Sequence, residues 1–171
     1  LGVSLKTGRS ISTVIGESFP ISAKLGGMAA ITAAIVGLIL GSIAALKRNT
    51  FIDRFIVFIT TLFTAVPSFV LATLLLYVFC IILKWSPVFD PDKTHYVLPV
   101  IALALYPMAY ITRLTKTSML DALSQDYIRT ANAKGVAGWK VIFKHALSNA
   151  VIPVITYFGP MLAYILPGTP L

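Results

Sequence analysis

Residues 121–153, DALSQDYIRTANAKGVAGWKVIFKHALSNAVIP, form the one long polar stretch between two strongly apolar ones. Before Gly135, the side chains of Tyr127, Ile128 and Ala131 recur at helical spacing and predict a short helix with one apolar face. Gly135 suits a left-handed helix C-cap, which a residue with a Cβ would strain. After this glycine, apolar residues again recur at three- and four-residue steps. The stretch therefore predicts two short helices that meet at a glycine elbow.

The composition on either side of this stretch is that of a membrane protein. Hydrophobic residues make up 57% of the 171 positions and charged residues 12%, about half the usual share of a soluble protein. Residues 25–46, 55–83 and 146–171 carry no charge, and each block exceeds the roughly 20 residues that a helix needs to cross a bilayer. A shorter uncharged block covers residues 96–112. Helices buried inside a soluble protein would need a polar shell that this chain does not supply.

We therefore expect an all-α integral membrane protein, built as a polytopic helix bundle. About four transmembrane helices are predicted, at about 22–46, 55–83, 97–114 and 146–166, and the third is expected to continue as a helix into a cytoplasmic loop at about 115–145. The first of these spans is rich in glycine and alanine, which permit close packing between helices in lipid.

Prolines mark the places where the predicted spans are expected to bend. As a straight helix, residues 55–83 would measure ~43 Å, more than the ~30 Å thickness of the hydrocarbon core. Pro67 is the expected kink, because proline removes one backbone hydrogen bond and crowds the preceding turn. Pro107 and Pro153 are the matching kink or hinge candidates in the third and fourth spans. A static packing kink and a moving hinge both remain open for Pro67.

Two further polar segments flank the spans. Residues 11–18 predict a short amphipathic helix that ends near Pro20, either as a surface helix or as the flank of the first span. Between the second and third spans, Asp90, Asp92 and His95 lie in a turn-rich loop. We interpret these three residues as a solvated loop rather than a metal site, so no metal is expected.

The basic residues predict the orientation of the chain. The segments after the first and third spans contain nine of the 14 Lys and Arg residues, and the other two polar segments contain five. The positive-inside rule then places the first two in the cytoplasm. The net charge of +8 thus reflects the orientation of the chain in the membrane. Nucleic-acid binding would require basic and aromatic residues interleaved on one exposed face, and the sequence has no such pattern.

Several kinds of chemistry are missing from the sequence. It contains no Gly-x4-Gly-Lys-Ser/Thr phosphate loop and no Ser/His/Asp set, and one cysteine with two histidines gives no metal-binding spacing. We therefore expect no enzymatic site and no cofactor bound by this chain. The predicted spans also lack the acidic or basic residues that ion-coupled carriers place within the membrane. If the chain transports a solute, its energy source is expected to be a partner protein.

The string Asp-Tyr-Ile-Arg-Thr-Ala-Asn-Ala-Lys-Gly at residues 126–135, followed by His-Ala-Leu at 145–147, Asn-Ala at 149–150 and Pro153, resembles the cytoplasmic EAA loop of ABC-transporter permeases. It is most similar to the branch that imports oligopeptides, dipeptides and nickel. The glutamate of the general motif falls on Arg129 and its first alanine on Thr130, while Ala131 and Gly135 keep the broad consensus. The resemblance covers most of the chain and includes the Pro-Ser-Phe string that begins at Pro67.

This resemblance implies a MetI-like permease fold, in which the polar loop forms a coupling helix that docks on an ATP-hydrolysing subunit. The residues implied in that contact are Asp126, Tyr127, Arg129, Ala131, Lys134 and Gly135. We expect Tyr127 and Ala131 to present an apolar docking face, Arg129 and Lys134 to pair with acidic groups, and Gly135 to permit the elbow. The ATP and magnesium would lie on the ATPase.

The resemblance also implies partners and a location. The partners are ABC ATPase subunits, a second homologous permease subunit, an extracytoplasmic substrate-binding protein and the lipid of a bacterial or archaeal plasma membrane. Residues 1–171 would be a partial permease domain without the first and last spans of the family, and residues 166–171 either a truncation or an added tail. The substrate and the identity of the second permease stay open. A passive channel subunit and a structural membrane anchor are the alternative functions.

Overall fold

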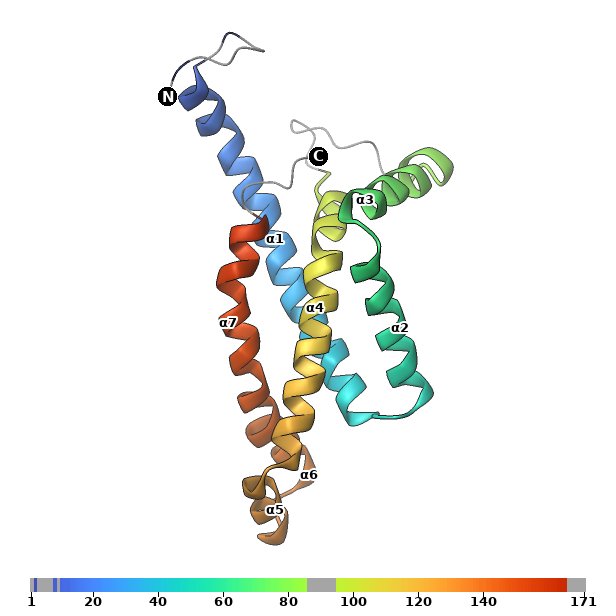
Figure 1. The fold of residues 1–171 in the computed structure, drawn as a ribbon, viewed down its shortest axis with the longest axis vertical. Coiled ribbons are helices and arrows are strands. Elements are labelled where there is room, and N and C mark those ends of the chain that lie inside the picture. The colour runs from blue at the N-terminus through green and yellow to red at the C-terminus, as the bar shows by residue number, and fades with distance from the viewer. Residues whose placement is uncertain (1, 3–7, 9, 86–94, 166–171) are drawn as a thin grey trace.

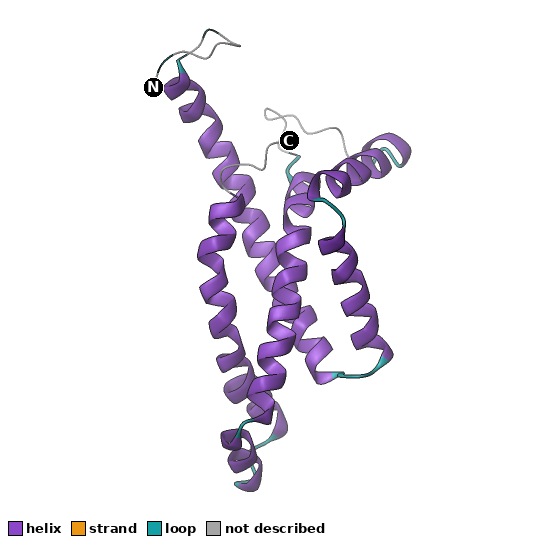
Figure 2. Cartoon of the chain, viewed as in Figure 1, coloured by secondary structure: helices purple, strands orange, loops and turns teal. Residues whose placement is uncertain are grey.

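The computed structural model describes residues 2, 8, 10–85 and 95–165, and these residues are almost entirely helical (Figures 1 and 2). The prediction of an all-α membrane protein is confirmed. Asp90, Asp92 and residues 166–171 lie outside the described residues. In chain order the elements are α1 (Ile11–Leu46), α2 (Phe51–Ala65), α3 (Ser68–Leu76), the π-helical segment η1 (Tyr77–Ile82), α4 (Val97–Ser124), α5 (Asp126–Ala133), α6 (Gly138–Lys140), the π-helical segment η2 (Val141–Leu147) and α7 (Ser148–Ile165).

Small residues bring α1 against α4. Ala29, Ala33, Gly37, Gly41 and Ala45 recur at every fourth position of α1, and all five are buried. A Cβ on Gly37 would lie 2.7 Å from the Cγ2 atom of Ile111, and one on Gly41 would lie 2.5 Å from the carbonyl oxygen of Thr112. In lipid, where apolar side chains gain little by leaving their surroundings, such close backbone approach supplies the packing energy between helices.

The first helix begins earlier than predicted and passes through Pro20. The expectation that a separate amphipathic helix ends near Pro20 is wrong, because α1 continues without interruption from Ile11 to Leu46. Proline at this position removes one donor, the one that would bond the carbonyl of Gly16. Both Gly16 and Pro20 are exposed, so that carbonyl stays open to other donors. The segment is therefore the flank of the first span.

The chain breaks sharply at Pro67. The helical segments Phe51–Ala65 and Ser68–Ile82 meet at 102°, so the span predicted at 55–83 consists of two arms and not of one kinked helix (Figure 1). Val66 is extended, with φ −89° and ψ 131°, as the steric effect of a following proline requires. Within the described residues, three helical stretches are long and apolar enough to cross a membrane, or four if the bent pair counts as one span.

The helix α4 is the centre of the bundle. It contacts α1, α2, α3 and α7, and in Figure 1 it lies between α7 and α2. The main core forms where α1, α4 and α7 meet, and it contains Ala29, Ala30, Ala33, Ala34, Val100, Ala104, Ile111, Val154, Met161 and Ile165. The ring of Tyr110 on α4 stacks on that of Tyr157 on α7 with 4.3 Å between centroids. This packing holds α4 in place along most of its length.

Candidate functional site

The polar segment, residues 121–147, lies at one end of the bundle, with α5 (Asp126–Ala133) beyond the ends of α1 and α2 (Figure 1). It is attached to the membrane helices on both sides without a flexible linker. The helix α4 runs from Val97 to Ser124, so the third span continues into the segment as predicted. On the other side, α6, η2 and α7 follow one another without a gap from Gly138 to Ile165. The second of the two expected short helices is therefore the beginning of the last membrane helix.

A small core holds α5 against its neighbours. Ile128 and Ala131 of α5 are buried, and they pack with Ala122 of α4 and with Val141 and Ala146 of η2. The expectation that Ala131 presents a docking face is wrong, because its side chain is only 8% exposed and points into this core. A helix of eight residues is too short to be stable alone, so its position depends on these contacts.

Gly135 ends α5 with a Schellman motif. Its φ is +73°, its N–H donates to the carbonyl of Asn132 at 3.0 Å, and the N–H of Val136 donates to the carbonyl of Ala131 at 3.1 Å. Val136 also packs on the small core that contains Ala131, as the hydrophobic contact of this motif requires. The predicted left-handed cap is confirmed, and the chain turns here from α5 towards α6.

A valine at Gly135 should misplace α5. Nothing lies within 4 Å of a Cβ built there, so the cost arises from the left-handed backbone, about 1–2 kcal/mol for an L-residue. We expect Gly135→Val to loosen α5 from the small core of Ile128 and Ala131 while the chain remains inserted in the membrane, measured as faster trypsin cleavage at the exposed Arg129 and Lys134. Gly135→Asn is the matched control, because asparagine tolerates this conformation, and it should be cleaved at close to the rate of the unmodified protein. Equal cleavage of the two variants would show that the position of α5 does not depend on the glycine elbow.

The outer face of α5 is polar and solvent-facing. Asp126, Tyr127, Arg129 and Lys134 are exposed. Arg129 Nη1 lies 3.5 Å from Asp126 Oδ1, with side chains 79% and 94% exposed, and such a surface pair contributes little to stability. The guanidinium of Arg129 is thus open to another acidic group. The Tyr127 hydroxyl accepts a hydrogen bond of 3.1 Å from the side-chain amide of Asn149, which fixes the ring between α5 and α7.

A buried ion pair beside this segment was not predicted. Asp53, at the start of α2, is 4% exposed, and its Oδ1 accepts a hydrogen bond of 2.5 Å from Lys116 Nζ of α4. Its Oδ2 accepts the backbone N–H of Asn49 at 3.0 Å. The pair fastens α2 to α4 near the point where α4 continues into the polar segment. The sequence feature that could have indicated this pair is that Asp53 is the one acidic residue in residues 47–54, beside three basic residues.

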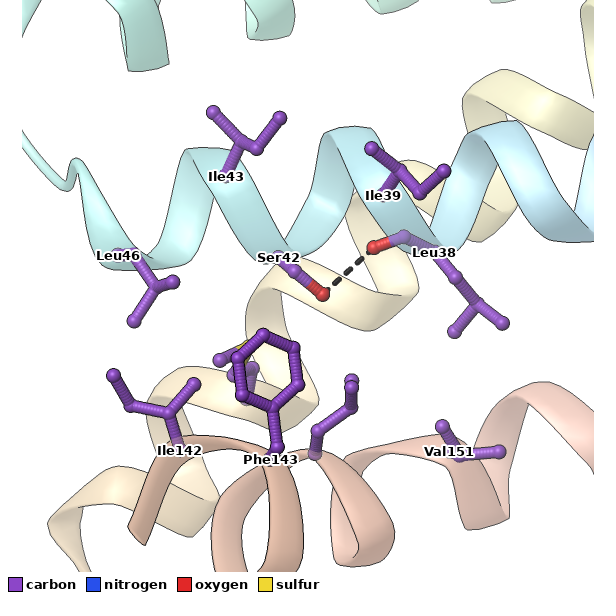
Figure 3. Close-up of a pocket in the computed structure, with 10 residues that line it drawn as sticks. Leu38, Ile39, Ser42, Ile43, Leu46, Ile142, Phe143 and Val151 are labelled. Carbon is purple, nitrogen blue, oxygen red and sulfur yellow. Dashed lines mark hydrogen bonds between the residues drawn. The ribbon is translucent and has the colours of Figure 1, made fainter. Parts of the chain in front are cut away.

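An apolar cleft of about 270 Å³ separates α1 from η2 and α7 (Figure 3). Phe143 projects from η2 towards Ser42 of α1 (Figure 3). The hydroxyl of Ser42 donates to the carbonyl of Leu38 at 2.7 Å, so this polar group is already satisfied. The ten lining residues include no titratable group, and they are Leu38, Ile39, Ser42, Ile43, Leu46, Met119, Ile142, Phe143, Leu147 and Val151. The cleft is therefore suited to apolar contacts only.

Residues 37–171 match the model of the family "binding-protein-dependent transport system inner membrane component". The chain belongs to this family. It is accordingly a multi-pass protein of the plasma membrane, as predicted. Within the described part of this permease, no three His, Cys, Asp or Glu side chains form a group that could hold a metal ion.

Curated relatives of the permease include peptide-transport proteins. The chain is 47% identical to the dipeptide transport system permease protein DppB of Bacillus subtilis over 165 residues, which are 96% of this chain and 54% of the relative. It is 40% identical to the oligopeptide transport system permease protein OppB of Salmonella typhimurium, over 94% of this chain and 53% of the relative. For the dipeptide permease DppB of Lactococcus lactis the identity is 37%, over 95% and 54%. The chain spans about half the length of these relatives.

The three proline candidates of the permease lie in different surroundings. Pro67 is at the break between α2 and α3, Pro107 is buried inside α4, which continues past it, and Pro153 lies inside α7. None of them lies in the polar segment. The role of these three prolines as hinges stays a prediction. The predicted contact residues, by contrast, all lie within residues 126–135, on α5 and its cap.

Proposed function

We propose that this chain is part of the transmembrane permease subunit of an ATP-driven importer of dipeptides or oligopeptides. The family and the peptide-transport relatives support the class of protein and of substrate. The observation that carries the proposal is the attachment of α5: its outer face is exposed, and its inner face is packed on the continuation of α4. A protein that binds the outer face and moves will move membrane helices with it.

In this proposal the polar segment is the contact with a partner ATPase. Arg129 and Lys134 pair with acidic groups of that subunit, and the ring of Tyr127, held by Asn149, supplies the apolar part of the contact. ATP and magnesium are bound by the partner. When two ATPase subunits close on ATP, they displace α5, and the small core around Ile128 and Ala131 passes this displacement to α4 and η2.

Movement of these helices changes access to the substrate path. A second homologous permease completes the path on the other side, and an extracytoplasmic binding protein delivers the peptide. Rocking of the two bundles opens the path first to the outside and then to the cytoplasm. A passive channel or a membrane anchor would not need a partner that hydrolyses ATP, and would not need a packed, exposed helix at its cytoplasmic end.

The test is charge reversal on the outer face of α5 in the full-length permease. We expect Arg129→Glu to weaken co-purification of the ATPase and to reduce ATP-driven uptake of tri-alanine by at least about tenfold, equivalent to ~1.4 kcal/mol of lost interaction. Lys47→Glu is the matched control, because Lys47 is also exposed and basic but lies in the loop between α1 and α2. Unchanged co-purification and uptake in Arg129→Glu would contradict the docking role of α5.

A further inference from the structure

One face of α4 carries a stripe of polar side chains that the rest of the described chain covers only in part. The polar stripe comprises Tyr106, Tyr110, Arg113, Thr117 and Asp121, whose spacings of three and four residues place them on one side of a helix. Tyr106 and Tyr110 are 37% and 40% exposed, Thr117 and Asp121 are exposed, and Arg113 is half-buried. The stripe therefore runs from inside the apolar part of α4 to the polar segment.

Along the middle and the second half of α4, the side opposite the polar stripe is buried. Ala104, Ile111, Thr115 and Met119 lie on the opposite side and are at most 3% exposed. The neighbours α1, α2, α3 and α7 all contact α4. From Ala104 onwards, the central helix of the bundle thus leaves the side with the polar stripe partly open and buries the opposite side.

The polar stripe is poorly suited to contact with lipid. Seven residues separate Tyr106 from Arg113, the first charge on α4, which corresponds to ~10 Å along the helix. Tyrosines that anchor a protein at the membrane interface lie at headgroup level, and Tyr106 is deeper than that. The exposed face of α1 has the apolar composition expected of a surface in lipid, since Ile31, Ile35 and Ile39 are 54–60% exposed. The polar stripe has a different composition, so we expect it to contact something other than lipid.

Close packing against another membrane helix also fits this face poorly. Helices that pack tightly in lipid use small residues at the contact, and this chain does so between α1 and α4 at Gly37 and Gly41. The polar stripe instead presents two large aromatic rings and a guanidinium. The ring of Tyr110 is held by its stack on Tyr157 at 4.3 Å, so it forms a fixed wall rather than a flexible filler.

We propose that the polar stripe lines the cytoplasmic half of the substrate path and contacts the peptide in transit. This inference rests on the proposed function and adds to it the residues that meet the substrate. The hydroxyls of Tyr106 and Tyr110 can exchange hydrogen bonds with peptide amide groups, which every peptide has regardless of its side chains. Arg113 makes no ion pair among the described residues, and its guanidinium suits the terminal carboxylate that every peptide carries. Because these groups are common to all peptides, such contacts would bind peptides in general and would not select one peptide sequence.

The test is the accessibility of cysteines introduced along the stripe. In a Cys80→Ala background of the full-length importer, Tyr106→Cys, Tyr110→Cys and Thr117→Cys are labelled with a charged methanethiosulfonate reagent from the cytoplasmic side of inside-out vesicles. The matched control is Ile35→Cys, on a helix face that is 55% exposed but apolar. Because only the hydrated thiolate reacts, we expect labelling of the stripe to be at least about tenfold faster than labelling of Ile35→Cys. Tri-alanine supplied with the binding protein and ATP should slow the labelling of Tyr110→Cys severalfold.

Three results would overturn the inference. Labelling of Tyr106→Cys and Tyr110→Cys as slow as that of Ile35→Cys, with reaction only towards a lipid-soluble maleimide, would place the stripe in lipid. Efficient cross-linking to the second permease in every nucleotide state would make it a subunit contact. Rapid labelling that tri-alanine never slows would show a water-filled space without substrate. Uptake of tri-alanine by the unmodified importer is measured separately, so its absence bears on the proposed function and not on the stripe.

Discussion

Replacement of Gly41 by valine is expected to separate α1 from α4 and to destabilise the whole bundle. A Cβ at this position would lie 2.5 Å from the carbonyl oxygen of Thr112 and 2.6 Å from the Cβ of Thr115. Neither atom is at the end of a flexible side chain, so the helices themselves must move. Overpacking of a close contact costs about 1–3 kcal/mol, and we expect the upper end of that range. The readout is the midpoint of thermal unfolding of the purified permease in detergent.

The control for Gly41→Val is Gly27→Val. Both glycines lie inside α1, so valine changes the intrinsic helix propensity by a similar amount at each. Nothing lies within 4 Å of a Cβ built on Gly27, so this variant should unfold close to the temperature of the unmodified protein. If the two variants unfold at the same temperature, the close approach of α1 and α4 is not what stabilises the bundle.

Replacement of Lys116 by methionine should have an effect of similar size for a different reason. It leaves the Asp53 carboxylate, 4% exposed, without its cationic partner. Breaking a buried pair from one side costs about 3–5 kcal/mol, and the lower end applies here because the Lys116 side chain is 21% exposed. The expected result is a lower midpoint of thermal unfolding of the purified permease, since α2 is no longer fastened to α4.

A second substitution distinguishes charge from packing. Adding Asp53→Asn to Lys116→Met removes the unpaired charge, and the asparagine side-chain oxygen can still accept the N–H of Asn49, which donates to Asp53 at 3.0 Å. The double variant should therefore recover most of the lost stability, because a buried pair can be replaced by neutral groups at small cost. A double variant less stable than Lys116→Met would mean that the Asp53 carboxylate stabilises the fold without Lys116, through its hydrogen bond from Asn49.

Local chemistry predicted the parts of this fold that depend on neighbouring residues. The uncharged blocks indicated where membrane helices lie, and the glycine after α5 indicated its left-handed cap, because both follow from a few consecutive positions. Pro67 marked the place of the break between α2 and α3. Its angle of 102° was not predictable, since proline prevents a straight helix but contacts with α4 decide where the second arm lies.

Contacts between distant residues were the part that the sequence did not reveal. Asp53 and Lys116 are 63 positions apart, and no local pattern pairs them. Ala131 was assigned to the outer face of α5 because Tyr127, Ile128 and Ala131 share a helical period. Helical spacing shows which residues share one side of a helix, but it does not show what that side contacts. In the structure, Ile128 and Ala131 pack inward against η2, while Tyr127 stays exposed. The face of α5 that is open to solvent is therefore the polar one.

The two attachments of the polar segment differ in stiffness. On one side α4 enters it as an unbroken α-helix of 28 residues, which transmits a twist along its axis. On the other side the chain leaves through η2, seven residues in a π-helix, a geometry less favourable than the α-helix that can tighten or lengthen by small steps. The small core of α5 contacts both attachments, through Ala122 of α4 and through Val141 and Ala146 of η2. A displacement of α5 would therefore act at once on a stiff helix and on one that deforms more easily.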